Sequence, residues 1–164
     1  MKKIVLICLL CITTSALNAQ ETLGNITVKT GSSLDVYFYQ LSHYASGITL
    51  STQTTLGIYY KETDAGGLVT GNGWQLSIEP DGDIRSLYSN DFIPINVVDI
   101  SVDGGAPETL TGGKQLIKEG IAQDASIVIP DIVISYSIGK TNPITNVSNE
   151  RYMVLLNFIL EAKP

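Results

Sequence analysis

The amino-acid sequence predicts an all-β protein, an immunoglobulin-like antiparallel β-sandwich of about eight to ten strands. In residues 20–164, the sheet-favouring residues (Ile, Val, Thr, Tyr, Phe and Trp) account for 52 of 145 residues, whereas Ala, the best helix former, occurs six times. Gly and Pro interrupt the chain at short intervals, as turns do in sandwiches and barrels. A chain of this length buries about 68–70% of its unfolded surface, so one domain can fold without disulfides.

Residues 1–19 have the pattern of a bacterial secretory signal peptide. A short positive region precedes an apolar run at residues 4–12, and small or polar residues lead to a cleavage site after Ala19. The apolar run is too short to span a bilayer, and no later stretch is long and apolar enough either. We therefore expect a single domain over residues 20–164 that is secreted, or held at the cell surface or in the periplasm.

The expected mature chain lacks cysteine, because Cys8 and Cys11 both lie in the signal peptide. With His43 as the single histidine, this composition excludes a cysteine nucleophile, a Cys/His zinc site and a disulfide scaffold. The alternative, a lipoprotein signal with Cys11 as the lipidated residue, needs a small residue where Leu10 stands. The mature net charge of −8 argues against a nucleic-acid binder, which needs a basic face.

Several segments alternate apolar and polar residues, as half-buried strands do. In the first half of the chain they are residues 26–29, 34–39, 55–61 and 74–79. In residues 93–102 and 127–138 the alternation changes phase midway, which indicates a β-bulge or a strand that crosses between sheets. Residues 103–120 are rich in Gly, so we expect a long loop or a hairpin there, with a short helix at 114–119 as the alternative.

The C-terminal residues 151–161 are apolar on both alternating faces. This pattern is typical of a central strand that is covered on both sides, or of a strand whose second face meets a partner. We therefore expect residues 152–160 to lie centrally in the fold or against another molecule.

No residue pattern identifies a catalytic centre, a metal site or a cofactor site. His43 is the only side chain that titrates near neutral pH, but it lacks a nucleophile motif, and its segment, residues 41–44, resembles a polar strand end. Asp81, Asp83 and Asp103 lie in Gly-containing turns that could offer carboxylates to calcium, but the other oxygen ligands at fixed spacing are missing. We interpret these turns as solvated.

Five tyrosines cluster in the first half of the chain, and aromatic faces can stack on sugar rings. A glycan-binding face is therefore one interpretation. The other is that these are ordinary sheet residues, alternately inward and outward. The tyrosines are Tyr37, Tyr39, Tyr44, Tyr59 and Tyr60.

Two segments together resemble the WxL-type bacterial surface domains. Trp74 and Leu76, in the segment GWQLSI, resemble the first Trp-x-Leu motif of that family. Tyr152, Phe158 and Leu160, in the segment RYMVLLNFIL, resemble its closing strand, with Phe158 where the family has a second Trp. The resemblance implies a secreted all-β domain that associates noncovalently with the cell surface, an attachment commonly credited to peptidoglycan.

The segment GNITV at residues 24–28 is similar to the N-terminal extension that fimbrial subunits donate to a neighbouring subunit. That resemblance implies a filament assembled by strand addition, in which main-chain hydrogen bonds provide affinity.

We therefore expect an exported, non-enzymatic binding or adhesion domain whose partner is a protein or glycan of the cell envelope. A fimbrial or other homo-oligomeric subunit is the first alternative. A carbohydrate-binding or hydrolytic domain with an unrecognised site is the second, because carboxylate sites carry no sequence signature. We expect no cofactor, no nucleic acid and no transmembrane segment.

Overall fold

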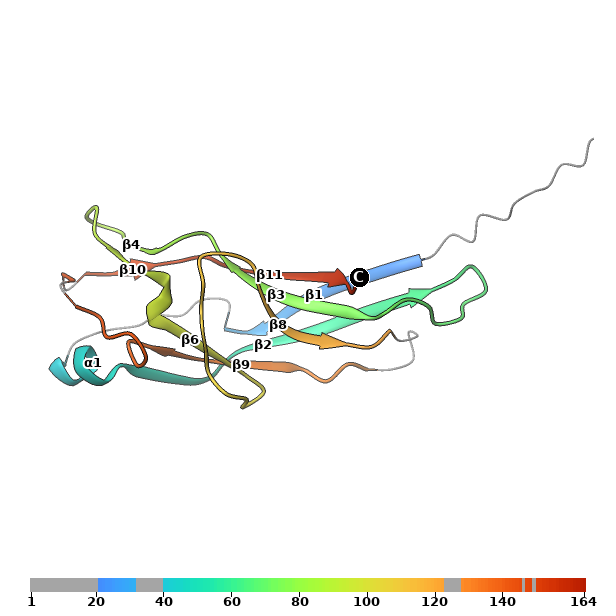
Figure 1. The fold of residues 1–164 in the computed structure, drawn as a ribbon, viewed down its shortest axis with the longest axis horizontal. Coiled ribbons are helices and arrows are strands. Elements are labelled where there is room, and N and C mark those ends of the chain that lie inside the picture. The colour runs from blue at the N-terminus through green and yellow to red at the C-terminus, as the bar shows by residue number, and fades with distance from the viewer. Residues whose placement is uncertain (1–20, 32–39, 123–127, 146, 149) are drawn as a thin grey trace, which may run out of the picture.

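The computed structural model describes residues 21–31, 40–122, 128–145, 147–148 and 150–164 (Figure 1). The expected signal peptide and the expected strand at residues 34–39 lie outside these ranges. Within them the chain forms antiparallel sheets, with one short α-helix and one 3₁₀ turn. No helix among these residues is long and apolar enough to cross a membrane.

The described residues form eleven strands, slightly more than the expected eight to ten. The strands are β1 (Glu21–Thr30), β2 (Ile48–Thr63), β3 (Trp74–Pro80), β4 (Ile84–Ser86), β5 (Phe92–Ile93), β6 (Val98–Val102), β7 (Glu108–Thr109), β8 (Gln115–Gly120), β9 (Ile132–Ile138), β10 (Tyr152–Met153) and β11 (Leu156–Ala162). The α-helix is α1 (Leu41–Ser46) and the 3₁₀ helix is η1 (Ile95–Val97).

The strands form three sheets arranged in two layers. Sheet A has the order β1-β2-β9-β6-β7, sheet B the order β11-β3-β8, and sheet C the order β10-β4-β5. Sheets B and C follow one another along one side of the molecule, because the chain passes directly from β3 to β4 and from β10 to β11 (Figure 1). Sheet A faces them, and the hydrophobic core contains residues from all three sheets.

Burial confirms the inward positions expected in residues 74–79, although Ser77, on the other alternation, is buried as well. Trp74, Leu76 and Ile78 of β3 are 0–3% exposed and point into the core. In β2 and β9 the inward positions are likewise buried, and all are apolar or aromatic except Thr54 and Glu62, which continue the inward row of β2 at its two ends. The apolar and aromatic ones are Leu56, Ile58, Tyr60, Ile132, Ile134, Tyr136 and Ile138.

The phase change in residues 93–102 is a crossing between sheets, one of the two expected alternatives, because β5 lies in sheet C and β6 in sheet A. Residues 95–97 form η1, closed by a hydrogen bond from the Val97 amide to the Pro94 carbonyl (3.2 Å), and β6 begins only at Val98. A helical turn shifts the alternation as an inserted residue would. Similarly, β9 begins only at Ile132, after Pro130, whose nitrogen cannot donate to a ladder. Residues 123–127 lie outside the described ranges.

One alternative and one expectation for local structure are wrong. The helix considered at 114–119 as the alternative to a loop or hairpin does not form: residues 115–119 lie in β8, because pairing with β3 overrides their local preference. Residues 41–44 belong to α1 rather than to a strand end. This helix spans six residues, and the Gly47 amide donates to the His43 carbonyl (3.0 Å) at its C-terminus.

Of the two expectations for the C-terminal strand, a central position covered on both sides is wrong, whereas contact with another molecule stays a prediction. Residues 152–162 form two strands, β10 and β11, that pair on one side only, with β4 and β3 respectively. The break lies where Leu155 bonds with Asp81, at the turn between β3 and β4, so the C-terminal segment follows the bend of its neighbour. Met153 and Leu155 are 62% and 59% exposed.

Candidate functional site

The structure brings four of the five motif residues to the inner face of sheet B. Leu160 lies directly opposite Leu76, and Trp74 pairs in register with Ala162, four residues beyond Phe158. Trp74 and Leu76 are buried, and Phe158 and Leu160 are half-buried against the same core. These side chains therefore pack the interior and do not form an exposed surface.

Tyr152, the fifth motif residue, lies on β10 in sheet C, opposite Ser86 of β4. Its hydroxyl donates to the Ser148 carbonyl (3.2 Å) and lies 3.1 Å from the Ser148 hydroxyl. Tyr152 thus anchors residues 147–148 to the small sheet.

The carboxylates considered for calcium bind backbone amides instead. Asp81 Oδ1 accepts from the Leu155 amide (3.1 Å), and Asp83 Oδ1 accepts from the Ile95 amide (3.0 Å). Asp103, at φ 52°, accepts from the Val133 amide (2.9 Å) and pairs with Lys118 (3.0 Å). Each carboxylate thus ties its turn to another segment: Asp81 to the link between β10 and β11, Asp83 to η1, and Asp103 to β8 and β9. In the described part of the chain, no three His, Cys, Asp or Glu side chains are grouped as metal ligands.

The described tyrosines of the first half do not form one aromatic face. Tyr59 is 44% exposed, Tyr60 is buried, and Tyr44 is half-buried. Tyr37 and Tyr39 lie outside the described residues. The alternation of Tyr59 and Tyr60 on β2 is that of ordinary sheet residues.

A shallow pocket of about 160 Å³ opens between the β6–β7 hairpin and β8. It is lined by Ile100, Val102, Gly105, Ala106, Glu108 and Ile117. Pockets that enclose small molecules usually measure about 300–1,000 Å³, so this one is small for a ligand site.

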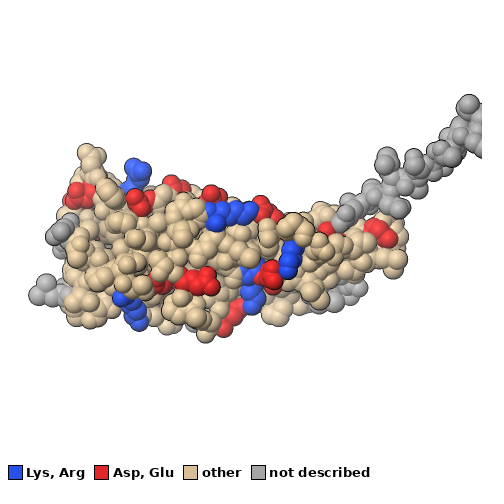
Figure 2. All heavy atoms as spheres, viewed as in Figure 1, with Lys and Arg blue, Asp and Glu red and all other residues tan. Residues whose placement is uncertain are grey.

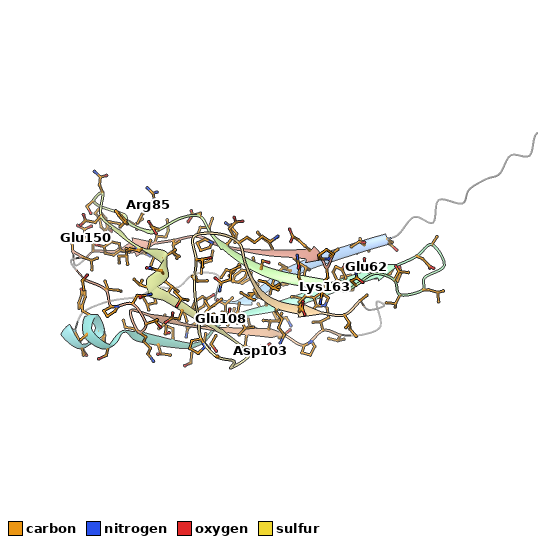
Figure 3. The ribbon with its side chains drawn as sticks, viewed as in Figure 1. Glu62, Arg85, Asp103, Glu108, Glu150 and Lys163 are labelled. Atoms are coloured by element: carbon orange, nitrogen blue, oxygen red, sulfur yellow. The ribbon has the colours of Figure 1, made fainter. Side chains whose placement is uncertain are left out.

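The outer face of sheet C has an unusual composition. The cross-strand row Met153–Arg85–Phe92 points away from the core, while the neighbouring Ile84 and Ile93 point inward and are buried. Figure 3 shows Arg85 on the side of β4 that faces away from sheet A. Positions two residues along extend the same face. We define the sheet C face as Arg85, Leu87, Phe92, Arg151, Met153 and Leu155, which are all exposed.

A hydrogen-bond network borders this face. The Ser86 and Ser89 hydroxyls both donate to Glu150 Oε2, the second over 2.8 Å. These hydrogen bonds, with Ser86 the larger contributor, hold the pKa of Glu150 below its usual value. The Ser148 hydroxyl donates to Asp91 Oδ2 (2.8 Å). The network ties residues 86–91 to Ser148 and Glu150 and holds carboxylates beside the face.

The positive charges elsewhere are mostly neutralised. Five lysines each pair with a carboxylate, as Lys29–Asp131, Lys61–Glu21, Lys114–Glu161, Lys118–Asp103 and Lys163–Glu119. Figure 2 shows acidic and basic side chains interspersed along the visible surface. By contrast, the side chains of Arg85 and Lys140 make neither a hydrogen bond nor an ion pair with another described residue. The Arg85 guanidinium is thus available to a partner.

Sequence reasoning missed this face. The available signal was that Arg85 and Arg151 are the only arginines of the chain, each one position from an apolar residue in a short alternating segment. The segments are too short and too far apart in sequence for the pattern to show that they adjoin.

Comparisons with protein-family models and with curated proteins found no match to this chain. The functional argument therefore depends on the geometry of the described residues.

Proposed function

We propose that the protein is an exported, non-enzymatic binding domain, an immunoglobulin-like β-sandwich that attaches to a protein or glycan of the bacterial cell envelope. The observation that carries this proposal is the sheet C face, where exposed Phe, Met, Leu and Arg side chains adjoin. Aromatic residues, Met and Arg are enriched in protein interfaces, whereas Lys, Asp and Glu are depleted from their cores. The six residues of the face include none of the depleted three.

The two-layer arrangement supports the sandwich architecture, because sheet A faces sheets B and C across one core. The expected signal peptide and the resemblance of Trp74, Leu76 and the closing strand to WxL-type surface domains support export and surface attachment. The segment similar to a donated fimbrial strand, residues 24–28, pairs in this structure with β2 of its own chain. This pairing favours a binding domain over a subunit that donates the segment.

The proposal is tested by cosedimentation with cell envelopes. The purified chain without residues 1–19 is mixed with envelopes of the producing cells, and the bound fraction is measured for wild type and for Arg85→Glu. Lys140→Glu is the matched control, because it makes the same charge change at an exposed position outside the face. We expect Arg85→Glu to lose binding and Lys140→Glu to retain it. Equal binding by all three proteins, or none by wild type, would refute the proposal.

A further inference from the structure

We propose that the outer edge of β8 is a second binding site, where an extended peptide segment of another protein adds as a strand to sheet B. The segment inserts one apolar side chain into the pocket between β8 and the β6–β7 hairpin, and carries a basic residue beside it. This site is separate from the sheet C face and goes beyond the proposed function.

The outer edge of β8 is open to another strand. β8 is an edge strand of sheet B, and among the described residues it pairs only with β3. The other long edge strands, β1 and β11, lie along each other, and the edge strands β5, β7 and β10 have two residues each. An unpaired edge presents amides and carbonyls at a fixed spacing, which is the pattern that recognises another extended backbone.

A β-bulge in β8 directs Ile117 toward the pocket. The register with β3 shifts between Lys118 and Leu116, so Ile117 is the extra residue. The Ile117 side chain is half-buried against the core and lines the pocket, whereas Leu116 is 49% exposed. Bulges at sheet edges commonly re-aim one side chain in this way.

The pocket has the volume of one large side chain. At about 160 Å³ it is smaller than most sites for free ligands, but an apolar cavity of about 150 Å³ accommodates a benzene ring. Its lining includes the apolar side chains of Ile100, Val102 and Ile117. Packed sheets lie about 10 Å apart, so a strand added to β8 points alternate side chains toward the β6–β7 hairpin. One of these side chains can therefore fill the pocket.

Two polar contacts join the walls of the pocket on either side of Ile117. Lys118 pairs with Asp103 over 3.0 Å, and the Gln115 side-chain amide donates to Glu108 over 3.4 Å. Both acidic residues belong to the β6–β7 hairpin (Figure 3). The contacts hold β8 and the hairpin in place before a peptide binds, which reduces the ordering cost of binding.

The charge of the pocket favours a basic neighbour for the apolar side chain. Glu108 lines the pocket, is exposed and forms no ion pair with another described residue. The net charge of the chain, −6, also favours a cationic partner over an acidic one. We therefore expect Lys or Arg close to the apolar residue of the segment.

Hydrogen exchange of the purified chain, followed by NMR, tests the site with the synthetic peptide KTFTKTK at about 1 mM. We expect the β8 amides that do not bond to β3 to exchange more slowly when the peptide is present. Unchanged exchange in β8, or spectral changes confined to the sheet C face, overturns the proposal. Protection of these amides that increases with protein concentration alone would make the occupant a second copy, which also overturns it.

Alternate N-methylation of the peptide tests the strand pairing. The amides of odd and even residues in an extended peptide point to opposite edges, so methylation of one set blocks pairing with β8 and methylation of the other set leaves it intact. We expect one methylated peptide to lose binding and the other to retain it. Equal binding or equal loss contradicts strand addition.

Filling the pocket tests the position of the apolar side chain. Ala106→Leu should weaken peptide binding about tenfold, because it excludes the Phe side chain from the pocket. Ala65→Leu, the same substitution at an exposed position outside the pocket, is the matched control, and Arg85→Glu should also leave peptide binding unchanged. Unchanged melting temperatures establish that the variants are folded. Equal affinities of Ala106→Leu and Ala65→Leu overturn the proposal.

Discussion

The indole ring of Trp74 lies directly against the backbone of Gly120, its cross-strand neighbour in β8. A Cβ atom added at Gly120 would lie 2.4–2.6 Å from three atoms of the ring. Because residue 120 has no side chain, the Trp74 ring can occupy this space, and Trp74 is 3% exposed.

Gly120→Ala should destabilise the protein by about 1–3 kcal/mol, the usual cost of overpacking a well-filled core. Urea denaturation measures the change. Gly112→Ala is the control, because a Cβ at that position meets no atom within 4 Å. Equal stability of both variants would show that the ring moves aside without cost.

Trp74→Ala should cost about 3–5 kcal/mol, because it empties a buried aromatic site. Trp74→Phe should cost less, because it keeps most of the apolar contact and removes the Trp74 Nε1 donor, which has no hydrogen-bond partner among the described residues. Thermal unfolding ranks the variants. A Trp74→Ala protein that kept its melting temperature but lost envelope binding would instead make Trp74 a ligand-binding residue.

The strands with buried inner faces could be predicted from the sequence, because the alternation of apolar and polar residues is visible within each segment by itself. Trp74, Leu76 and Ile78 were placed in the core by alternation alone, and their burial confirms it. The alternation does not indicate which strands pair with one another. The apolar C-terminal segment suggested a central strand, yet β11 bonds only to β3 and its other side lies along β1, where the Leu160 side chain packs close to Gly24.

The sheet C face could not be predicted from the sequence, because strand neighbours are not a local property of the sequence either. Arg85, Phe92 and Met153 become neighbours only through the register of three short strands, two of which contain two residues each. Strands of that length are too short to show a period. Conversely, the motif residues that stood out in the sequence are mainly core residues. Their large apolar side chains indicated packing in the interior and not a binding site.

Stability should fall as pH rises from about 10 toward 12. Burial, reinforced by the hydrogen bond from its hydroxyl to Glu62 (3.0 Å), raises the pKa of Tyr60 to about 12. Burial also raises the pKa of Tyr136. The folded state therefore keeps protons that the unfolded state loses near pH 10, so the stabilisation is complete below pH 10 and is lost above it.

Urea midpoints measured at neutral and at alkaline pH test this expectation. Tyr60→Phe should lessen the alkaline loss, whereas Tyr88→Phe, which removes a phenol that is 76% exposed, serves as the control. An identical alkaline loss in wild type and Tyr60→Phe would mean that other groups control unfolding at high pH.

At acidic pH the hydrogen-bond network around Glu150 should weaken. The pKa of Glu150 is lowered chiefly by the Ser86 hydroxyl and then by Ser89, so its contribution is complete above its unfolded value near 4.3 and is lost as pH falls through the folded value. Glu150→Gln should slightly lower the melting temperature at neutral pH and reduce its further decrease on acidification. Glu79→Gln is the matched control, because it makes the same substitution at a carboxylate with no hydrogen bond to another described residue, and a pH profile unchanged by Glu150→Gln contradicts the assignment.

Deleting residues 150–164 should abolish soluble, monomeric protein. The deletion removes β10 and β11, and with them the partners of β4 and of the outer side of β3. The half-buried Phe158 and Leu160 leave the core at the same time, and the uncovered β3 presents buried apolar side chains beside an unpaired strand edge, a template for aggregation. Removing only Lys163 and Pro164 is the control, because it leaves all of β11 in place. A peptide of residues 150–162 added during refolding should restore solubility by pairing with β3 and β4.

A soluble, monomeric deletion variant with unchanged circular dichroism would show that the C-terminal strands are dispensable, and that sheet C does not depend on β10.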